Sequence, residues 1–210
     1  MGLLGKTLDF AKKATSVAID SANRKLDEAK QKRLDEERSF LQEFPYKNRC
    51  TIKLSGSYEI YDTEDCLRYS TKGFGLMEAN NFWLASPDGN QHCKFHKALF
   101  NIPSPFTKDR KACSLEFPSK ELVEIETYVS FKVREYSISG SNLSITVDEK
   151  EKEFRIFKNN NTKPDIHIYR VWSSEGFLKY KYYVGFDDPA DELLAVSLTI
   201  GIDAVRFSGD

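Results

Sequence analysis

The sequence predicts a mainly β protein in which ten to twelve short strands enclose a C-terminal helix, with a second, long helix at the N-terminus. Three observations carry this prediction. Residues 186–207 join a strong helix start to an apolar run, residues 50–184 alternate apolar and polar side chains between turn signals, and residues 2–42 contain no proline. Strands with turn signals at this spacing are typical of a barrel or a sandwich.

The C-terminal stretch, FDDPADELLAVSLTIGIDAVRF, begins with capping residues and then becomes apolar. Asp187 or Asp188 suits the N-cap and Pro189 suits the first helical position. The following apolar residues fall on every face, as in a helix enclosed by protein or by lipid. The run is shorter than the roughly 18 apolar residues of a membrane span. We therefore predict a buried central helix at about 188–206, with core residues Leu194, Leu198, Ile202 and Asp203.

The N-terminal stretch is rich in Ala, Lys, Glu and Leu, which favours one long helix that ends before Pro45. Its first half is apolar and small, whereas its second half is mostly charged. A coiled-coil seam is not sustained, because Arg33 and Glu36 fall at positions that should be apolar. We expect a helical extension at 1–44 and a β domain at 45–210.

The middle of the chain changes to a period of two, which is typical of strands. Asp88-Gly89 supplies the turn chemistry that hairpins prefer. Segment 122–138 alternates strictly, so one face is expected to be buried and the other wet. The other predicted strands are 58–62, 66–70, 82–86, 91–96, 143–147, 154–157, 166–172 and 177–184.

Composition excludes several classes of protein. The net charge of −1 and the pI near 6.4 do not suit a nucleic-acid binder. The four cysteines are widely spaced and lack a CxxC pair, so we expect buried free thiols and a reducing compartment. The N-terminus lacks the apolar core of a signal peptide, and we expect a cytoplasmic protein.

Candidate catalytic and metal-ligating residues are few. His92 and His96 are expected to share a strand face about 13 Å apart, too far to chelate one metal. Asp203 stands in the apolar helix, where a buried carboxylate needs a hydrogen bond or an ion pair. The sequence contains no motif of a hydrolase, an NTPase or a metalloprotease. We expect no catalytic residues, no metal and no cofactor.

Four segments resemble the LURP-one-related, tubby C-terminal-like family, whose superfamily includes the phospholipid scramblases. They are SYEIYD with LRYSTKG, FWLASPDGNQHCKFHKALF, EKEFRIFK and, most specifically, DDPADELLAVSLTIGIDAVRF. The resemblance covers about residues 57–207, and residues 101–120 are not placed by it. It implies a closed antiparallel β-barrel of about 12 strands around the hydrophobic C-terminal helix.

The resemblance implies two membrane-related activities. Scramblases carry a proposed acidic calcium segment just before the helix, but segment 178–186 lacks the carboxylates that calcium requires, so calcium-driven scrambling is not expected. Tubby domains bind phosphoinositides through a basic surface. Lys179 and Lys181 are the corresponding candidates here, although no cluster of four or more basic residues accompanies them.

The N-terminal helix offers two functional hypotheses. The first is a non-enzymatic binding or scaffold module whose helix mediates protein interaction or self-association. The second is a peripheral protein at the inner face of a membrane, whose helix and barrel surface bind anionic phospholipid. Residues 1–25 carry five basic and two acidic side chains, a net charge of +3. The expected contact residues in either case are Leu4, Leu8, Phe10, Lys12, Lys13 and Val17.

Overall fold

The structure is a computed structural model that describes residues 3–54, 56–72, 81–100, 109–129, 134–148, 150–172 and 180–206. Within these ranges, side chains are described except at 3–18, 98–100, 109–111, 129, 172 and 180. The chain divides into two compact units, Met1–Phe44 and Pro45–Asp210.

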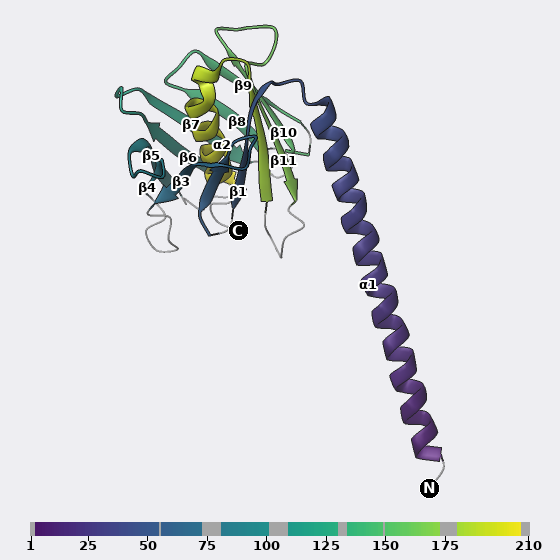
Figure 1. Cartoon of the computed structure of the whole chain (residues 1–210). Helices are drawn as coiled ribbons and strands as arrows, with labels where there is room; N and C mark the ends of the chain where they lie inside the picture. Colours follow the sequence, from purple (N-terminus) through teal and green to yellow (C-terminus); the bar gives the residue numbers. More distant parts are fainter. Residues whose placement is uncertain are drawn as a thin grey trace. The chain divides into compact units, whose positions relative to one another are not determined.

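The first unit is a single helix, α1 (Leu3–Glu43), of 41 residues (Figure 1). Its described side chains are mostly exposed between residues 19 and 43. Arg24 and Glu28 form an i,i+4 ion pair at 3.4 Å, and the Gln31 amide donates to the Asp35 carboxylate at 3.0 Å. Pairs of this kind stabilise a polar helix surface.

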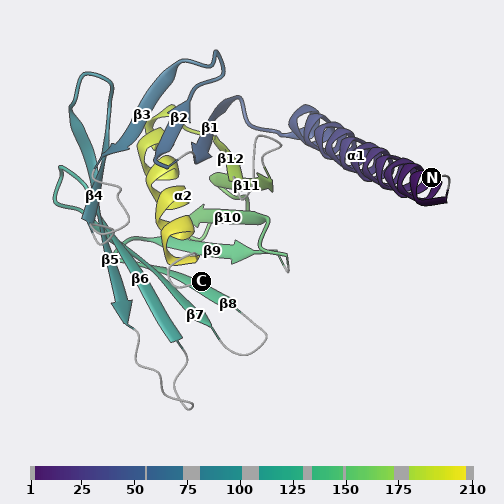
Figure 2. The same ribbon diagram turned by 90° about the horizontal axis from the view of Figure 1, so that it is seen from below.

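The second unit is a twelve-stranded antiparallel sheet that curls into a nearly closed barrel (Figure 2). Its ladder order is β8-β7-β6-β5-β4-β3-β2-β1-β12-β11-β10-β9. The strands are β1 (Asn48–Leu54), β2 (Tyr58–Tyr61), β3 (Leu67–Lys72), β4 (Asn81–Ala85), β5 (Gln91–Phe100), β6 (Asp109–Glu116), β7 (Leu122–Val129), β8 (Arg134–Ser139), β9 (Leu143–Val147), β10 (Glu153–Lys158), β11 (Ile166–Trp172) and β12 (Tyr180–Phe186).

The interior of the barrel follows the strand register. Apolar side chains line up across neighbouring strands because every second residue faces inward. One such row crosses β4 to β7, and its Phe82 and Phe95 rings stack at a centroid distance of 4.6 Å. A second row crosses β1, β12, β11, β10 and β9. Its members are Cys50, Val184, Ile168, Phe154 and Val147.

The C-terminal helix occupies this interior (Figure 1). A short 3-10 turn, η1 (Pro189–Asp191), leads into α2 (Glu192–Arg206), and the Asp188 carboxylate caps the turn by accepting from the Ala190 amide at 2.9 Å. α2 lies against β5, β6, β7 and β12. At Gly201 the helix lies close to the wall, because a Cβ built there would lie 2.5 Å from Cδ1 of Ile125.

The fold prediction is confirmed: the structure is an antiparallel barrel of twelve strands around a buried C-terminal helix. Two of the strands, β1 and β6, were not predicted from the sequence. β6 falls inside the segment 101–120 that the family resemblance did not place. Parts of two predicted strands, 130–133 and 177–179, lie outside the described residues.

Candidate functional site

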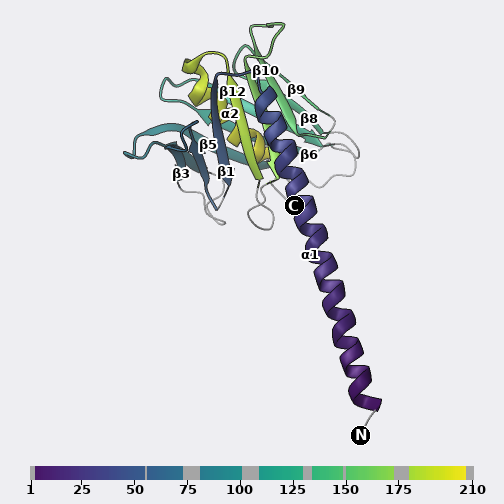
Figure 3. The same ribbon diagram turned by 45° about the vertical axis from the view of Figure 1, so that its right-hand side comes forward.

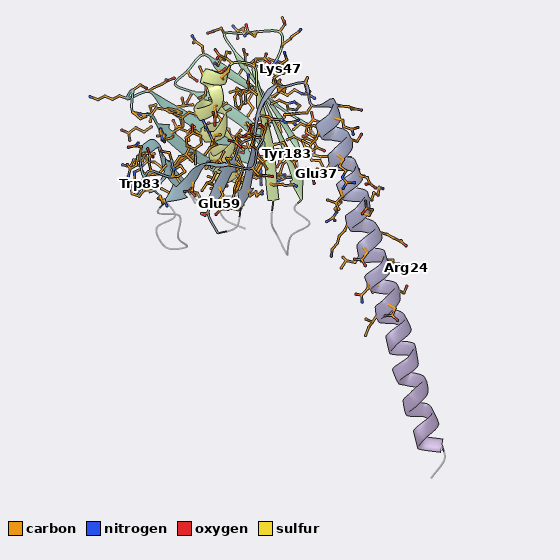
Figure 4. All side chains as sticks on the ribbon, in the orientation of Figure 1. Arg24, Glu37, Lys47, Glu59, Trp83 and Tyr183 are labelled. Atoms are coloured by element: carbon orange, nitrogen blue, oxygen red, sulfur yellow. The ribbon has the colours of Figure 1, made fainter. Side chains whose placement is uncertain are left out.

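The exposed surface of α1 is the first candidate. Ile19 and Leu26 are 53% and 56% exposed, and they stand seven residues apart on the same face of the helix. The small residues Ala22 and Ala29 lie beside them on the same stretch. Arg24 and Glu37 project from the same helix (Figure 4). The described half of α1 therefore carries a short apolar stripe within a charged surface.

The contact residues that the sequence predicts on this helix lie before Ile19 in the chain, N-terminal to the apolar stripe. The backbone of α1 is described from Leu3, but side chains are described only from Ile19 onward. The side chains of all six predicted contact residues therefore lie outside the described ones. They are Leu4, Leu8, Phe10, Lys12, Lys13 and Val17.

Lys181 lies on the outer face of the barrel, on β12. Its ammonium lies 5.3 Å from the centroid of the Tyr183 ring, a cation-π arrangement. Directly opposite on β1 is Lys53, whose ammonium lies 4.4 Å from the centroid of the Tyr61 ring. Sequence reasoning missed Lys53, because only the ladder register places it beside Lys181. Lys179 lies outside the described residues.

The outer face of β1, β2 and β12 also carries acidic groups. Glu59, opposite Lys53 in the ladder, accepts a hydrogen bond from the Tyr61 hydroxyl at 2.9 Å. Lys53 lies 3.9 Å from the Asp65 carboxylate. Glu59 and Tyr183 are both labelled in Figure 4. The charges on this face are thus mixed rather than uniformly basic.

Asp203, near the end of α2, is fully enclosed in the barrel. The hydroxyls of Tyr58 and Tyr182, on β2 and β12, donate to its two carboxylate oxygens. Burial raises the pKa of Asp203, while these two hydrogen bonds and the charges of Arg170 and Lys97 act in the opposite direction. The arrangement fixes the last turns of α2 to the wall from two sides. Neither tyrosine was identified as a donor from the sequence, because Tyr58 and Tyr182 lie 145 and 21 residues away from Asp203 in the chain.

The other members of the predicted core helix differ in burial. Leu198 and Ile202 are buried, whereas Leu194 is only partly so. Leu194 lines a cavity of about 240 Å³ at the start of the helix, together with Lys158 and Asn159. Lys158 forms an ion pair with the buried Asp191 of η1.

His92 and His96 have separate surroundings on β5. His92 is the extra residue of a β-bulge, because Leu84 pairs with Cys93 and Ala85 pairs with Gln91. Its Nε2 lies 2.8 Å from the Ser86 hydroxyl, which in turn donates to Asp88 at 2.5 Å. In a catalytic triad the carboxylate would accept from the histidine. This serine instead donates to the carboxylate, so the three residues stabilise the turn.

His96 lies at the other end of the same strand face. It hydrogen-bonds to the Asn81 side chain, and its Nε2 lies 3.5 Å from the Glu116 carboxylate. Glu116 also borders an open groove of about 340 Å³ on the outside of the barrel. The groove combines aromatic and charged side chains, chiefly Trp83, His92, Lys94, Glu116 and Phe117.

The cysteines are all free thiols, and three of them are buried in the barrel. Burial raises the pKa of Cys93 and of Cys113 to about 12, and it also raises the pKa of Cys50. Cys66 is exposed in the turn between β2 and β3, so the expectation of buried thiols is wrong for this cysteine. Because the thiolate is the reactive form, only Cys66 is poised to react in the folded protein.

We therefore expect a thiol-reactive disulfide reagent to modify one cysteine per chain rapidly at neutral pH, and all four in denaturant. Cys66→Ser should remove the rapid phase and leave the three slow thiols unchanged. Rapid modification of any thiol in the Cys66→Ser variant would contradict the burial of Cys50, Cys93 and Cys113.

Among the described residues, no three His, Cys, Asp or Glu side chains come together as a metal site would require. In the segment before α2, the part from residue 180 forms β12, where Tyr182 and Val184 face the interior. Among the residues that the structure describes, no helix is long and apolar enough to cross a membrane.

These features define the class of the molecule as an antiparallel barrel with an enclosed C-terminal helix and a separate helical unit. No protein-family model matches the sequence, and no curated protein matches it. The chain is similar in structure to a LURP-one-related protein from Arabidopsis thaliana solved by X-ray crystallography. The TM-score is 0.46 at 11% identity, over 77% of this chain and 93% of the plant protein. A likeness at that level carries no functional argument.

Proposed function

We propose that the chain is a non-enzymatic binding or scaffold module, in which α1 mediates protein interaction or self-association. The observation that supports this proposal is the exposed stripe of Ile19 and Leu26 on a helix of 41 residues. Most helical stability in proteins comes from packing an apolar face against a neighbour. A partner that covers these two side chains would supply such packing.

The interior of the barrel is filled by side chains, so the proposal assigns binding to the outer surfaces. α2 and the inward-facing side chains form one continuous hydrophobic core. Asp203 on α2 has a structural role, because its carboxylate accepts hydrogen bonds from two tyrosyl hydroxyls. The barrel is then the folded domain to which α1 is joined in the chain.

We further propose that the chain belongs to the LURP-one-related, tubby C-terminal-like family and works in the cytoplasm. The family proposal rests on the four sequence segments that resemble this family, together with the twelve-stranded barrel. The compartment follows from the four free thiols, which persist where the environment is reducing.

A peripheral membrane role is the alternative. It is favoured by the net charge of +3 over residues 1–25, which would attract an anionic surface. The stretch 19–43 is nearly balanced, with six basic and seven acidic side chains. Protein association is therefore the better fit for the described part of the helix.

Light scattering on four chains tests self-association: the full chain, a shortened chain that begins at Pro45, and the variants Leu26→Asp and Ser21→Asp. Ser21 is exposed and lies on roughly the opposite side of α1, so it is a control with the same added charge. We expect a mass above that of the monomer for the full chain and for Ser21→Asp. We expect monomers for Leu26→Asp and for the shortened chain.

Monomers in all four cases would contradict self-association and leave a foreign protein as the partner of α1. Sedimentation with anionic vesicles then distinguishes the membrane alternative. Equal partitioning of the full and the shortened chain would exclude a membrane role for α1. Sedimentation of the full chain alone would favour the membrane role over the proposed one.

A further inference from the structure

The barrel has a seam between β8 and β9. These strands stand at the two ends of the ladder order, and the short turn 140–142 joins them. β8 is hydrogen-bonded to β7, and β9 to β10, but no ladder joins β8 to β9 among the described residues. The two strands nevertheless lie side by side (Figures 2 and 3). Apart from the covalent turn, side-chain contacts rather than a backbone ladder connect the two sides of the seam.

Side chains supply that closure around Glu151, in the turn between β9 and β10. The Glu151 carboxylate lies 2.9 Å from Nε of Arg206, at the end of α2, and 3.6 Å from Arg134, at the start of β8. The hydroxyl of Tyr136, also on β8, lies 3.5 Å from the same carboxylate oxygen. One carboxylate on the β9–β10 side thus contacts β8 across the seam and the end of the enclosed helix.

Further contacts complete the cluster. Arg134 donates to the backbone carbonyl of Arg206 at 3.3 Å, and Arg206 donates to the carbonyl of Glu151 at 3.4 Å. The ring of Tyr136 packs edge-on against Phe154 of β10, at a centroid distance of 5.4 Å. Glu151 itself adopts a positive φ of 51°, which is uncommon for a residue with a side chain.

The cluster is suited to hold β8 and the end of α2 against the turn between β9 and β10. The Glu151, Arg134 and Arg206 side chains are only 15–21% exposed, so water screens their attraction less than it would on an open surface. Two arginines share one carboxylate, so removal of the Glu151 charge weakens the contacts of both Arg134 and Arg206 with the turn between β9 and β10. The backbone ladder elsewhere in the barrel has no such dependence on a single side chain.

We propose that the β8–β9 seam is the joint at which the barrel opens, and that Glu151 is the latch that keeps it closed. Opening separates β8 from β9 and β10 and releases the C-terminal end of α2, while the ladder from β7 through β1 to β10 stays intact. The interior then becomes accessible at Tyr136 and Phe154.

Hydrogen exchange on the full chain, read by mass spectrometry at segment resolution, tests the proposal. In the wild type, amides of β8 and β9 are expected to exchange faster than those of β6 and β12. Glu151→Gln, which keeps the size and removes the charge, should speed exchange in β8 and β9 by about tenfold, as expected for the loss of a charge-assisted contact. β6 and β12 should be unaffected.

The matched control is Glu153→Gln. Glu153 pairs with Arg155 at 2.6 Å on the same strand, β10, and that ion pair does not cross the seam. We expect no change in β8 exchange in this variant. Equal protection of β8 and β6 in the wild type would overturn the proposal. An identical effect of the two substitutions on β8 would overturn it as well.

Discussion

Leu198→Asp is expected to abolish folding of the barrel unit. Leu198 is completely buried in the middle of α2, within the core that joins the helix to the barrel wall. An unpaired carboxylate there carries a desolvation cost of several kcal/mol. The cavity and the lost apolar contacts cost about 2–5 kcal/mol more. The sum reaches the whole stability of a typical domain, about 5–15 kcal/mol.

The chain provides a matched control in Leu26→Asp, the same substitution at a leucine that is 56% exposed on α1. Near-ultraviolet circular dichroism and thermal unfolding report on the barrel, which holds both tryptophans of the chain. We expect Leu26→Asp to retain the barrel signal and its cooperative transition. A soluble Leu198→Asp variant that unfolds cooperatively would contradict the enclosure of α2.

Asp203→Ala is expected to lower the free energy of unfolding by about 2–6 kcal/mol. The substitution removes the acceptor of the Tyr58 and Tyr182 hydroxyls, both of which are buried. Each stranded hydroxyl costs about 1–3 kcal/mol. Asp203→Asn keeps the size and one acceptor oxygen, so its loss should be smaller. Equal stability of Asp203→Ala and the wild type in urea unfolding would contradict the role of this carboxylate.

The same site predicts how stability depends on pH. Burial raises the pKa of Asp203, so the folded state binds the proton more tightly than the unfolded state, whose pKa is about 4. Stability from this group is present at low pH and lost as the pH rises through the folded pKa. Relative to Asp203→Asn, the wild type should therefore gain stability as the pH falls toward 4. A difference that is independent of pH would contradict the raised pKa.

Tyr58 and Tyr182 make the stability of the fold depend on pH in the alkaline range. Burial and the neighbouring Asp203 charge raise the pKa of Tyr58 and of Tyr182. The unfolded state then loses protons from about pH 10, while the folded state keeps them. We expect stability to fall as the pH rises above 10, and ultraviolet absorbance should show both tyrosines ionising together with unfolding.

The sequence predicted the fold where local signals agreed with the tertiary arrangement. Pro189 and the capping aspartates located the start of the central helix, and the period of two located most strands. β1 was not predicted although its Cys50, Ile52 and Leu54 alternate with polar residues. In β6 the alternation is broken, because the neighbours Ala112 and Cys113 are both buried. The seam could not be predicted either, because it depends on which strands pair and not on their composition.

The candidate sites were harder to predict from the sequence than the fold. Asp203 was expected to need a partner, but its two donors are 145 and 21 residues away in the chain. Lys53 faces Lys181 only through the β1–β12 register. The cluster at Glu151 joins β8, a turn and the end of α2, which are far apart in sequence. Such contacts follow from topology and leave no local pattern.

Hydrogen exchange in α1 at two protein concentrations tests the central proposal most directly. A helix with a polar surface and no neighbour is marginally stable, so its amides should exchange rapidly unless another chain packs on it. The proposal predicts that protection of residues 19–43 rises with concentration in the full chain and not in Leu26→Asp. Rapid exchange that is the same at both concentrations would contradict self-association through α1.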